Sequence, residues 1–191
     1  MTYVVALVAG YLLGAVSPAT VWARHRGYDL RASGSGNPGA TNVGRLLGRR
    51  VGITVAVLDV AKGYVPALLF SLAVSHRAGL VAGLAAMLGH VTSPYLRGHG
   101  GKGVATAAGA ILGSHPLWAP FVLVVWIVVV RLTHWVALGS VAAALVLPVI
   151  ALVSGAPGPD LLWAAAIAGV VLFRHRVNFV RRFRRSSTDS A

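Results

Sequence analysis

A chain of 191 residues that is 57% hydrophobic and only 11% charged is typical of a polytopic membrane protein, and it leaves no room for a separate soluble domain. Its formal charge of +13 is attributed to cytoplasmic loops rich in Lys and Arg, so we expect no nucleic-acid partner. The lack of Cys excludes disulfides and thiolate metal sites, and the lack of Glu leaves few carboxylates for a mechanism that needs a pair of them.

Seven apolar segments follow one another along the chain and predict transmembrane helices. They are residues 3–22, 51–75, 78–96, 104–113, 117–130, 135–153 and 160–173. The first segment has no basic residues before it, so we expect a retained span rather than a cleaved signal peptide. The run 104–130 is divided because "GSHP" at Gly113–Pro116 breaks a helix: proline lacks a backbone donor and disfavours helix just before it.

The basic residues fix the expected orientation. With seven crossings, 15 of the 17 Lys and Arg residues fall on one side, leaving Arg77 opposite and Lys62 inside a span. The positive-inside rule then places the N-terminus outside and the C-terminus in the cytoplasm. The fold expected is therefore all-α, a polytopic integral membrane protein with seven transmembrane helices, some of them short. We expect one transmembrane domain, residues 1–185, and a disordered polar tail, residues 186–191.

The first polar loop reads "GSGNPGATNVGR" from Gly34 to Arg45. Glycines allow successive amides to converge on an anion, and hydroxyl and amide side chains add donors. The candidate anion-binding residues here are Ser35 and Arg45, with Gly34, Gly36, Asn37, Gly39, Thr41 and Asn42. A flexible surface loop is the alternative, because Gly, Ser and Asn are ordinary turn residues.

The second polar loop reads "RGHGGKGVAT" from Arg97 to Thr106. Gly100, Gly101 and Gly103 surround Lys102 just before a helix, which is a favourable place for an anion. It is not a Walker A loop, because Gly-Lys is followed by Gly rather than Ser or Thr. Two such loops on one membrane face favour phosphate chemistry.

Other polar groups carry weaker signals. His175 and Asn178 lie one helical turn apart in the basic tail, and Ser140 lies in an apolar helix where a small residue ordinarily serves packing. Asp59 and Lys62 share a helix face, which favours a structural ion pair over direct catalysis. No His or carboxylate cluster has ligand spacing, so neither a metal nor a cofactor is expected.

Three motifs together resemble those of the PlsY family, the bacterial membrane acyl-phosphate:glycerol-3-phosphate acyltransferases. They are "GSGNPGATNVGR", "GGKGVAT" at Gly100–Thr106 and "HRVN" at His175–Asn178, and the similarity spans nearly the whole chain. The resemblance implies transfer of a fatty acyl group from acyl phosphate to the primary hydroxyl of sn-glycerol 3-phosphate, giving lysophosphatidic acid and phosphate. It also implies a multi-pass protein of the bacterial cell membrane whose active site faces the cytoplasm.

Matching the motifs by position implies roles for single residues. Ser35, Arg45, Lys102, Asn178 and His175 match essential positions, and we expect them to be catalytic. Gly100, Gly101 and Gly103 match the glycerol 3-phosphate loop, with Ser140 as a hydroxyl near it, and Thr106 is expected to belong to the same substrate site. The expected partners are both substrates and membrane lipid; the oligomeric state is left open, with a monomer as one option.

The chain also departs from the family pattern. Arg185 and Ser187 stand where the third motif usually ends in Gly and Glu, and "HVTSPYLRGHGG" after His90 carries Ser93, Arg97 and His99 where Pro, Gly and Lys are usual. Two alternatives therefore stay open. One is a small transporter or binding protein for a phosphorylated lipid or metabolite, and the other is a diverged inactive paralogue.

Overall fold

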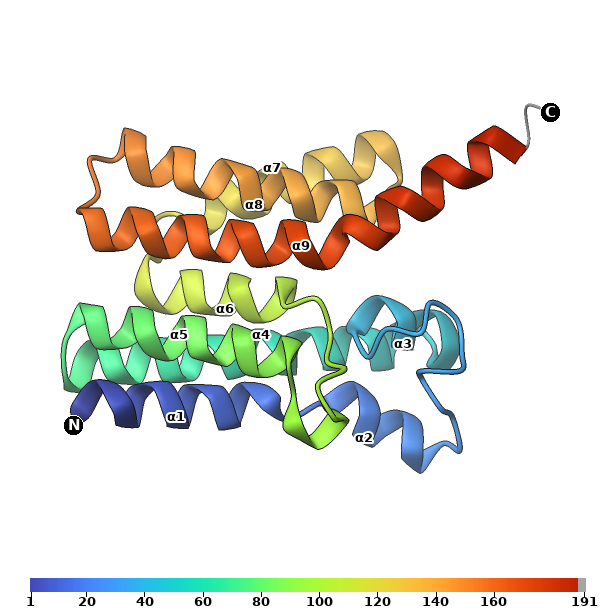
Figure 1. The fold of residues 1–191 in the computed structure, drawn as a ribbon, viewed down its shortest axis with the longest axis horizontal. Coiled ribbons are helices and arrows are strands. Elements are labelled where there is room, and N and C mark those ends of the chain that lie inside the picture. The colour runs from blue at the N-terminus through green and yellow to red at the C-terminus, as the bar shows by residue number, and fades with distance from the viewer. Residues whose placement is uncertain (189–191) are drawn as a thin grey trace. The chain divides into compact units, whose positions relative to one another are not determined.

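A computed structural model describes the backbone of residues 1–188 and the side chains of residues 1–180 and 182. The chain divides into two compact units, Met1–Ala119 and Pro120–Ala191. Helices and turns make up the described residues, without a β-strand among them (Figure 1). The expected all-α fold is therefore observed, and each unit is considered separately below.

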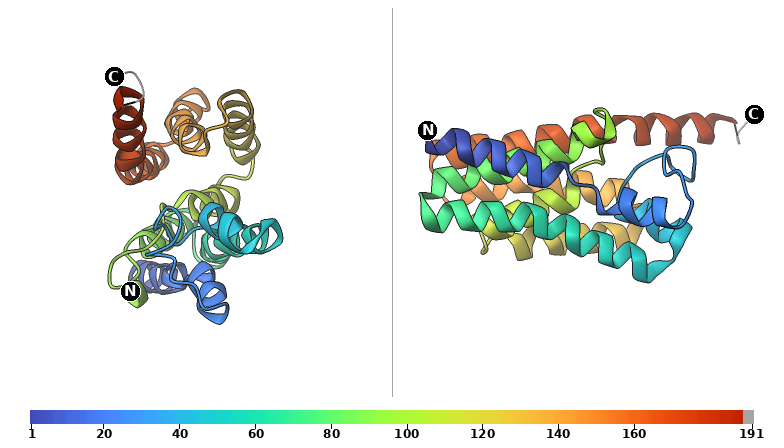
Figure 2. Two further views of the ribbon diagram at one scale, coloured as in Figure 1. Left: turned by 90° about the vertical axis from the view of Figure 1, so that its right-hand side faces the viewer. Right: turned by 90° about the horizontal axis from the view of Figure 1, so that it is seen from below.

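The first unit contains six α-helices and a short 3₁₀ helix. They are α1 (Thr2–Ala15), α2 (Pro18–His25), α3 (Ala40–Leu47), α4 (Arg49–Ala73), α5 (His76–Val91), η1 (Pro94–Leu96) and α6 (Val104–Ser114). Helix α5 packs against α1, α4 and α6, and α4 also packs against α6 and α3. Figures 1 and 2 show α2 and α3 together at the end of this unit away from the N-terminus.

The expected first span, residues 3–22, is observed as two helices. Helix α1 ends at Ala15 and α2 begins at Pro18, with the Ser17 side chain accepting a hydrogen bond from the backbone N–H of Thr20. Proline at the first helical position and serine as the N-cap together start a new helix here.

Small residues bring the helices of this unit close together. A Cβ added at Gly14 or Gly89 would collide with backbone of the facing helix, since α1 and α5 touch there, and one at Gly63 would collide with the Thr106 carbonyl across the α4–α6 contact. Such small-residue contacts are characteristic of packing between membrane helices. They fix the ends of α5 and α6, from which the second glycine loop emerges.

The second unit contains α7 (Ala119–Thr133), α8 (Val136–Val153) and α9 (Gly158–Thr188). Helices α8 and α9 pack along each other, and Trp126 of α7 donates a hydrogen bond from Nε1 to Ser140 Oγ of α8 at 3.3 Å. Near the start of the basic half of α9, Phe179 packs on Trp135 with ring centroids 4.7 Å apart.

Four helical segments of the described chain are long and apolar enough to cross a membrane. They are Thr2–His25, Arg49–Ala73, His76–Leu96 and Val136–Val153, and the shorter apolar helices are Val104–Ser114 and Ala119–Thr133. The break expected at residues 113–116 is present, because α6 ends at Ser114 and α7 begins at Ala119. The count of seven spans and the single domain remain predictions. So does the disordered tail 186–191: α9 continues to Thr188, and residues 189–191 lie outside the described residues.

Candidate functional site

The first glycine-rich loop passes directly into a helix. Gly39 is the N-cap of α3, so Thr41, Asn42 and Arg45 lie on a helix rather than in an extended loop. Val43 is fully buried and packs in a cluster with Val55 of α4, which anchors α3. Ser35, Thr41 and Arg45 remain exposed to solvent. The anchored helix thus offers exposed donors at one end of the unit.

Asn42 holds this loop in shape. Its Oδ1 accepts a hydrogen bond from the Ser35 backbone N–H at 2.8 Å, and its Nδ2 donates to the Ser33 carbonyl at 3.1 Å. The side chain is only 2% exposed, and Gly34, with φ of +62°, lies against its amide where a Cβ would collide. These bonds are internal to the loop, so they indicate a structural role for Asn42; substrate contact by Asn42 stays a prediction.

The second glycine-rich loop folds back onto the end of α5. The backbone N–H of Gly100 donates to the Val91 carbonyl at 3.1 Å, and that of Gly101 donates to the His90 carbonyl at 3.0 Å. A Cβ on Gly100 would collide with the His90 carbonyl, and one on Gly101 would collide with the His90 ring at Nε2. Glycine is needed here for close packing, and both amides are used within the protein.

The N-terminus of α6 is the candidate anion site of this loop. Gly103, with φ of +81°, is its N-cap and has no side chain with which to cap the first turn. The first backbone N–H groups of a helix have no acceptor within the helix, and they form the positive end of its dipole. Lys102, which is half-buried, comes just before this end. An oxyanion held by the first-turn amides and Lys102 is therefore chemically favoured.

Thr106 follows in the first turn of α6, and it is fully buried, with no hydrogen-bond partner for Oγ1 among the residues that the structure describes. Its carbonyl lies against Gly63 of α4. This position suits helix packing, and the expected substrate contact of Thr106 stays a prediction.

Arg31 connects the two loops. Its guanidinium donates from Nη2 to the carbonyl of Leu96, which ends η1 just before the second loop. Arg31 itself comes three residues before Gly34, where the first loop begins. The two candidate loops therefore lie at the same end of the first unit, as a shared site requires.

A buried ionic cluster lies beneath the second loop. Lys62 Nζ is 3.0 Å from Asp59 Oδ1, and His90 Nδ1 is 3.6 Å from the same oxygen. Lys62 also donates to the Val16 carbonyl at 2.7 Å. The three side chains are between 2% and 7% exposed. The ion pair expected between Asp59 and Lys62 is therefore present, and His90 adjoins it.

The remaining candidates belong to the second unit. Ser140 Oγ donates to the Val136 carbonyl at 2.9 Å and accepts from Trp126, which fits a residue at a helix contact. His175 Nδ1 lies 2.8 Å from the Val171 carbonyl, one turn earlier on α9, and Asn178 is half-buried one turn later. The substrate or catalytic roles of these three residues stay predictions.

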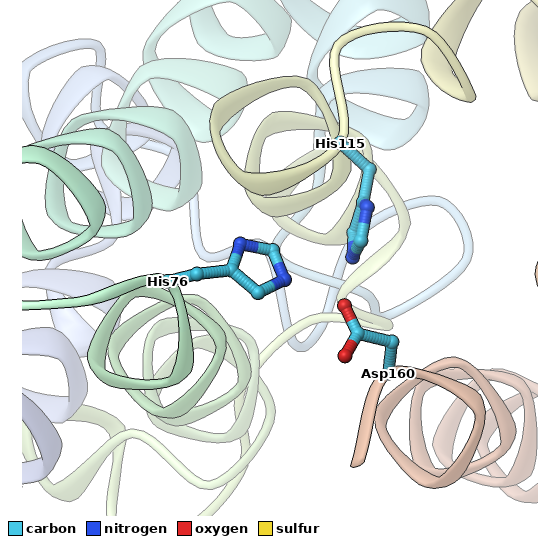
Figure 3. A group of neighbouring side chains, drawn as sticks. All are labelled: His76, His115 and Asp160. Carbon is cyan, nitrogen blue, oxygen red and sulfur yellow. The ribbon is translucent and has the colours of Figure 1, made fainter. Parts of the chain in front are cut away.

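Two histidines mark the opposite end of the first unit from the glycine loops. His76 begins α5 and His115 follows α6; their rings meet edge to face with centroids 4.9 Å apart (Figure 3). His115 also stacks on Trp118 at 3.7 Å. Asp160, also labelled in Figure 3, lies in the first turn of α9 in the second unit. Within the first unit, this aromatic group joins the first turn of α5 to the segment that follows α6.

Sequence reasoning missed Arg31, His90 and Ser93 as parts of the site's framework. Ser93 Oγ donates to the Ala15 carbonyl at 2.6 Å, which ties the end of α1 to the segment after α5. These contacts join positions 65 to 78 residues apart for Arg31 and Ser93, so no local pattern signals them. His90 stands out in the sequence only as an ionisable residue at the end of an apolar segment.

Comparison with known proteins gives consistent results. A family described as glycerol-3-phosphate acyltransferase matches residues 4–185. A glycerol-3-phosphate acyltransferase of Geotalea daltonii is 40% identical over 188 residues, covering 98% of this chain and 96% of the relative. One of Aquifex aeolicus is 38% identical, covering 92% of each chain.

A solved structure is similar throughout. It is a crystal structure of PlsY (YgiH), an integral membrane glycerol 3-phosphate acyltransferase, in its glycerol 3-phosphate form. The TM-score is 0.92 and the identity 35%, covering 96% of this chain and 93% of that one. The resemblance read from the three motifs is confirmed, and together with the apolar helices this supports a membrane protein.

Proposed function

This chain belongs to the glycerol-3-phosphate acyltransferase family, and from that membership we propose that it transfers a fatty acyl group from an acyl phosphate to the primary hydroxyl of sn-glycerol 3-phosphate. The bond between the acyl carbon and the phosphate oxygen breaks, and an ester bond to the glycerol oxygen forms. The products are lysophosphatidic acid and inorganic phosphate, so the enzyme catalyses the first acylation of phospholipid synthesis.

The observation that carries this proposal is the meeting of two glycine-rich loops at one end of the first unit. The α6 N-terminus with Lys102 is suited to the phosphate of glycerol 3-phosphate, because both supply positive potential to an oxyanion. Arg45, exposed on α3, is suited to the phosphate of the donor through a bidentate pair, with Ser35 as a further donor. Two phosphorylated substrates thus have two cationic sites.

The chemistry needs little more than charge stabilisation. Acyl phosphate is already activated, and cations and backbone amides stabilise the negative charge that develops on the carbonyl and phosphoryl oxygens. The chain contains no Glu, and its Asp59 is buried in an ion pair. We propose that a phosphate oxygen of the donor takes the hydroxyl proton. Loss of all activity on replacing a single histidine, with a shifted pH profile, would contradict this route.

The motif match supports catalytic roles for His175 and Asn178 in this reaction. It supports binding of the acceptor, glycerol 3-phosphate, by Ser140. For the chain as a whole, the charge distribution supports seven spans in the bacterial cell membrane, with the N-terminus outside and both glycine loops facing the cytoplasm. Membrane lipid then surrounds the apolar helices and gives the acyl chain of the donor access from the bilayer.

The test is acyl transfer by purified protein supplied with palmitoyl phosphate and glycerol 3-phosphate, followed as lysophosphatidic acid and released phosphate. We expect Arg45→Ala and Lys102→Ala to lower kcat/KM by about 10- to 100-fold, because each removes a charge-assisted contact worth about 1.5–3 kcal/mol. Both variants should remain folded in detergent, since neither side chain is fully buried.

Matched controls are Arg49→Ala, an exposed arginine that begins α4 four residues after Arg45, and Arg97→Asn, which keeps a residue tolerant of the observed positive φ of 51°. Both controls should stay within about twofold of the wild type, as exposed charges outside a site contribute little. A transporter or an inactive paralogue would release no phosphate above the hydrolysis blank. Near-normal rates for both Arg45→Ala and Lys102→Ala would show that the site is assigned wrongly.

A further inference from the structure

The buried cluster of Asp59, Lys62 and His90 has no part in the chemistry described above, yet it adjoins the loop that precedes α6. Ionisable side chains within an apolar helix are costly to bury, and those in membrane helices commonly mark functional positions. The contacts of the cluster indicate what that purpose is.

One side of the cluster holds the end of α1. Lys62 donates to the Val16 carbonyl, and Ser93 donates to the neighbouring carbonyl of Ala15. The last carbonyls of a helix have no partner within it, so these two bonds satisfy groups that the break before α2 leaves open. The position of Lys62 is therefore fixed from α1 as well as from α4.

The other side of the cluster holds the second glycine loop. The His90 ring has Asp59 Oδ1 3.6 Å from Nδ1, while Nε2 faces Gly101 so closely that a Cβ there would collide with it. The His90 carbonyl accepts the Gly101 N–H, and the next carbonyl, of Val91, accepts the Gly100 N–H. Both the ring and the backbone of this turn of α5 therefore form the surface on which the loop lies.

Asp59 is the link between the two sides. At 3.6 Å its oxygen is too far from Nδ1 for a normal hydrogen bond, but the carboxylate still attracts an N–H at that nitrogen and so orients the ring. The ring occupies the space that a Cβ of Gly101 would need, so a change in the ring's orientation would change the surface against which Gly101 packs. Lys102 and the N-cap Gly103 come next in the chain, so displacement of Gly101 would displace the anion site.

We propose that Asp59, Lys62 and His90 form a positioning network that holds the loop at residues 100–103 in the shape that binds the phosphate of glycerol 3-phosphate. The network sets the affinity for the acceptor rather than the rate of acyl transfer. This inference rests on the proposed function, from which the identity of the acceptor is taken.

The test compares two double variants that both remove the charges. Asp59→Leu with Lys62→Met removes the carboxylate oxygen beside His90 Nδ1, whereas Asp59→Asn with Lys62→Met keeps an oxygen there. Both lose the Lys62 bond to Val16 equally, so their difference isolates the group that orients His90. KM and kcat for glycerol 3-phosphate, its Kd from calorimetry without donor, and Tm in detergent are measured for each.

For the Leu/Met variant we expect KM and Kd to rise about 10- to 100-fold with kcat within about twofold, since a charge-assisted contact to the phosphate contributes about 1.5–3 kcal/mol to binding. The Asn/Met variant should recover most of the affinity. Wild-type affinity in both, equal impairment of both, or a fall in kcat at unchanged KM would overturn the proposal.

A third variant keeps the test decisive if the Leu/Met protein does not fold. His90→Leu leaves the Asp59–Lys62 pair intact and should raise KM and Kd in the same way, while wild-type affinity in this variant would contradict the proposal. Calorimetry beside the activity assay also distinguishes failure of the proposed function from failure of the positioning network. A wild-type protein that forms no lysophosphatidic acid refutes the proposed function, whereas a wild type that binds glycerol 3-phosphate no better than the variants refutes the network.

Discussion

Replacing Asn42 tests whether the shape of the first loop matters for catalysis. Asn42→Ala removes two hydrogen bonds, one to the Ser35 N–H and one to the Ser33 carbonyl. A typical intramolecular hydrogen bond contributes about 0.5–1.5 kcal/mol, so the loop would lose about 1–3 kcal/mol. Because Ser35 and its neighbours are exposed, water would satisfy the freed groups, and we expect the lower part of this range.

A loss of about 1–1.5 kcal/mol reduces the equilibrium constant for ordering the loop about 5- to 13-fold. We therefore expect kcat/KM for palmitoyl phosphate to fall by this factor while Tm in detergent changes little, because the core contact of α3 is made by Val43. Initial rates at varied donor concentration measure the change. The control is Thr54→Ala, which removes a hydrogen bond to the Arg50 carbonyl on an exposed face of α4. An Asn42→Ala enzyme within twofold of the wild type would refute the reasoning.

Two further predictions concern the second loop and the topology. Gly100→Ala should lower activity about 100-fold, because its Cβ meets the His90 carbonyl, whereas Gly98→Asn, at φ of +78° with open space around it, should stay within about threefold in the same assay. The absence of Cys allows single-cysteine labelling. An impermeant maleimide should label Ser154→Cys in intact cells but His99→Cys only after permeabilisation; the opposite pattern would invert the proposed orientation.

A helix boundary was predicted from the sequence where a proline interrupted a long apolar run. The break between α6 and α7 was predictable from "GSHP". The same kind of signal at Ser17–Pro18 was overlooked, because the hydropathy of residues 3–22 is continuous across it. Helix α3 was missed for a different reason: Asn42 and Gly44 are poor helix formers, and packing of Val43 against α4 overrides that preference.

Both candidate loops are recognisable in the sequence as glycine-rich polar segments, but the hydrogen bonds of their amides were not predictable. The sequence placed Gly100 and Gly101 at a candidate anion site before a helix, whereas their amides donate to carbonyls of α5. That outcome depends on where α5 ends relative to the loop, which is a tertiary property. In the first loop, likewise, Asn42 bonds to groups seven and nine residues earlier instead of pointing outward.

The unequal lengths of α5 and α6 have a consequence for where the two reactants meet. Gly103 lies beside Met87 and Val91, so the 11-residue α6 begins about a turn short of the end of α5 and rises only about 16 Å. In a bilayer with a hydrocarbon thickness of about 30 Å, a helix of this length spans only about half of the thickness, so under the proposed function its N-terminus would hold the acceptor near the depth of the acyl carbonyl. The acyl chain of the donor could then stay in the lipid while acyl phosphate reacts with glycerol 3-phosphate.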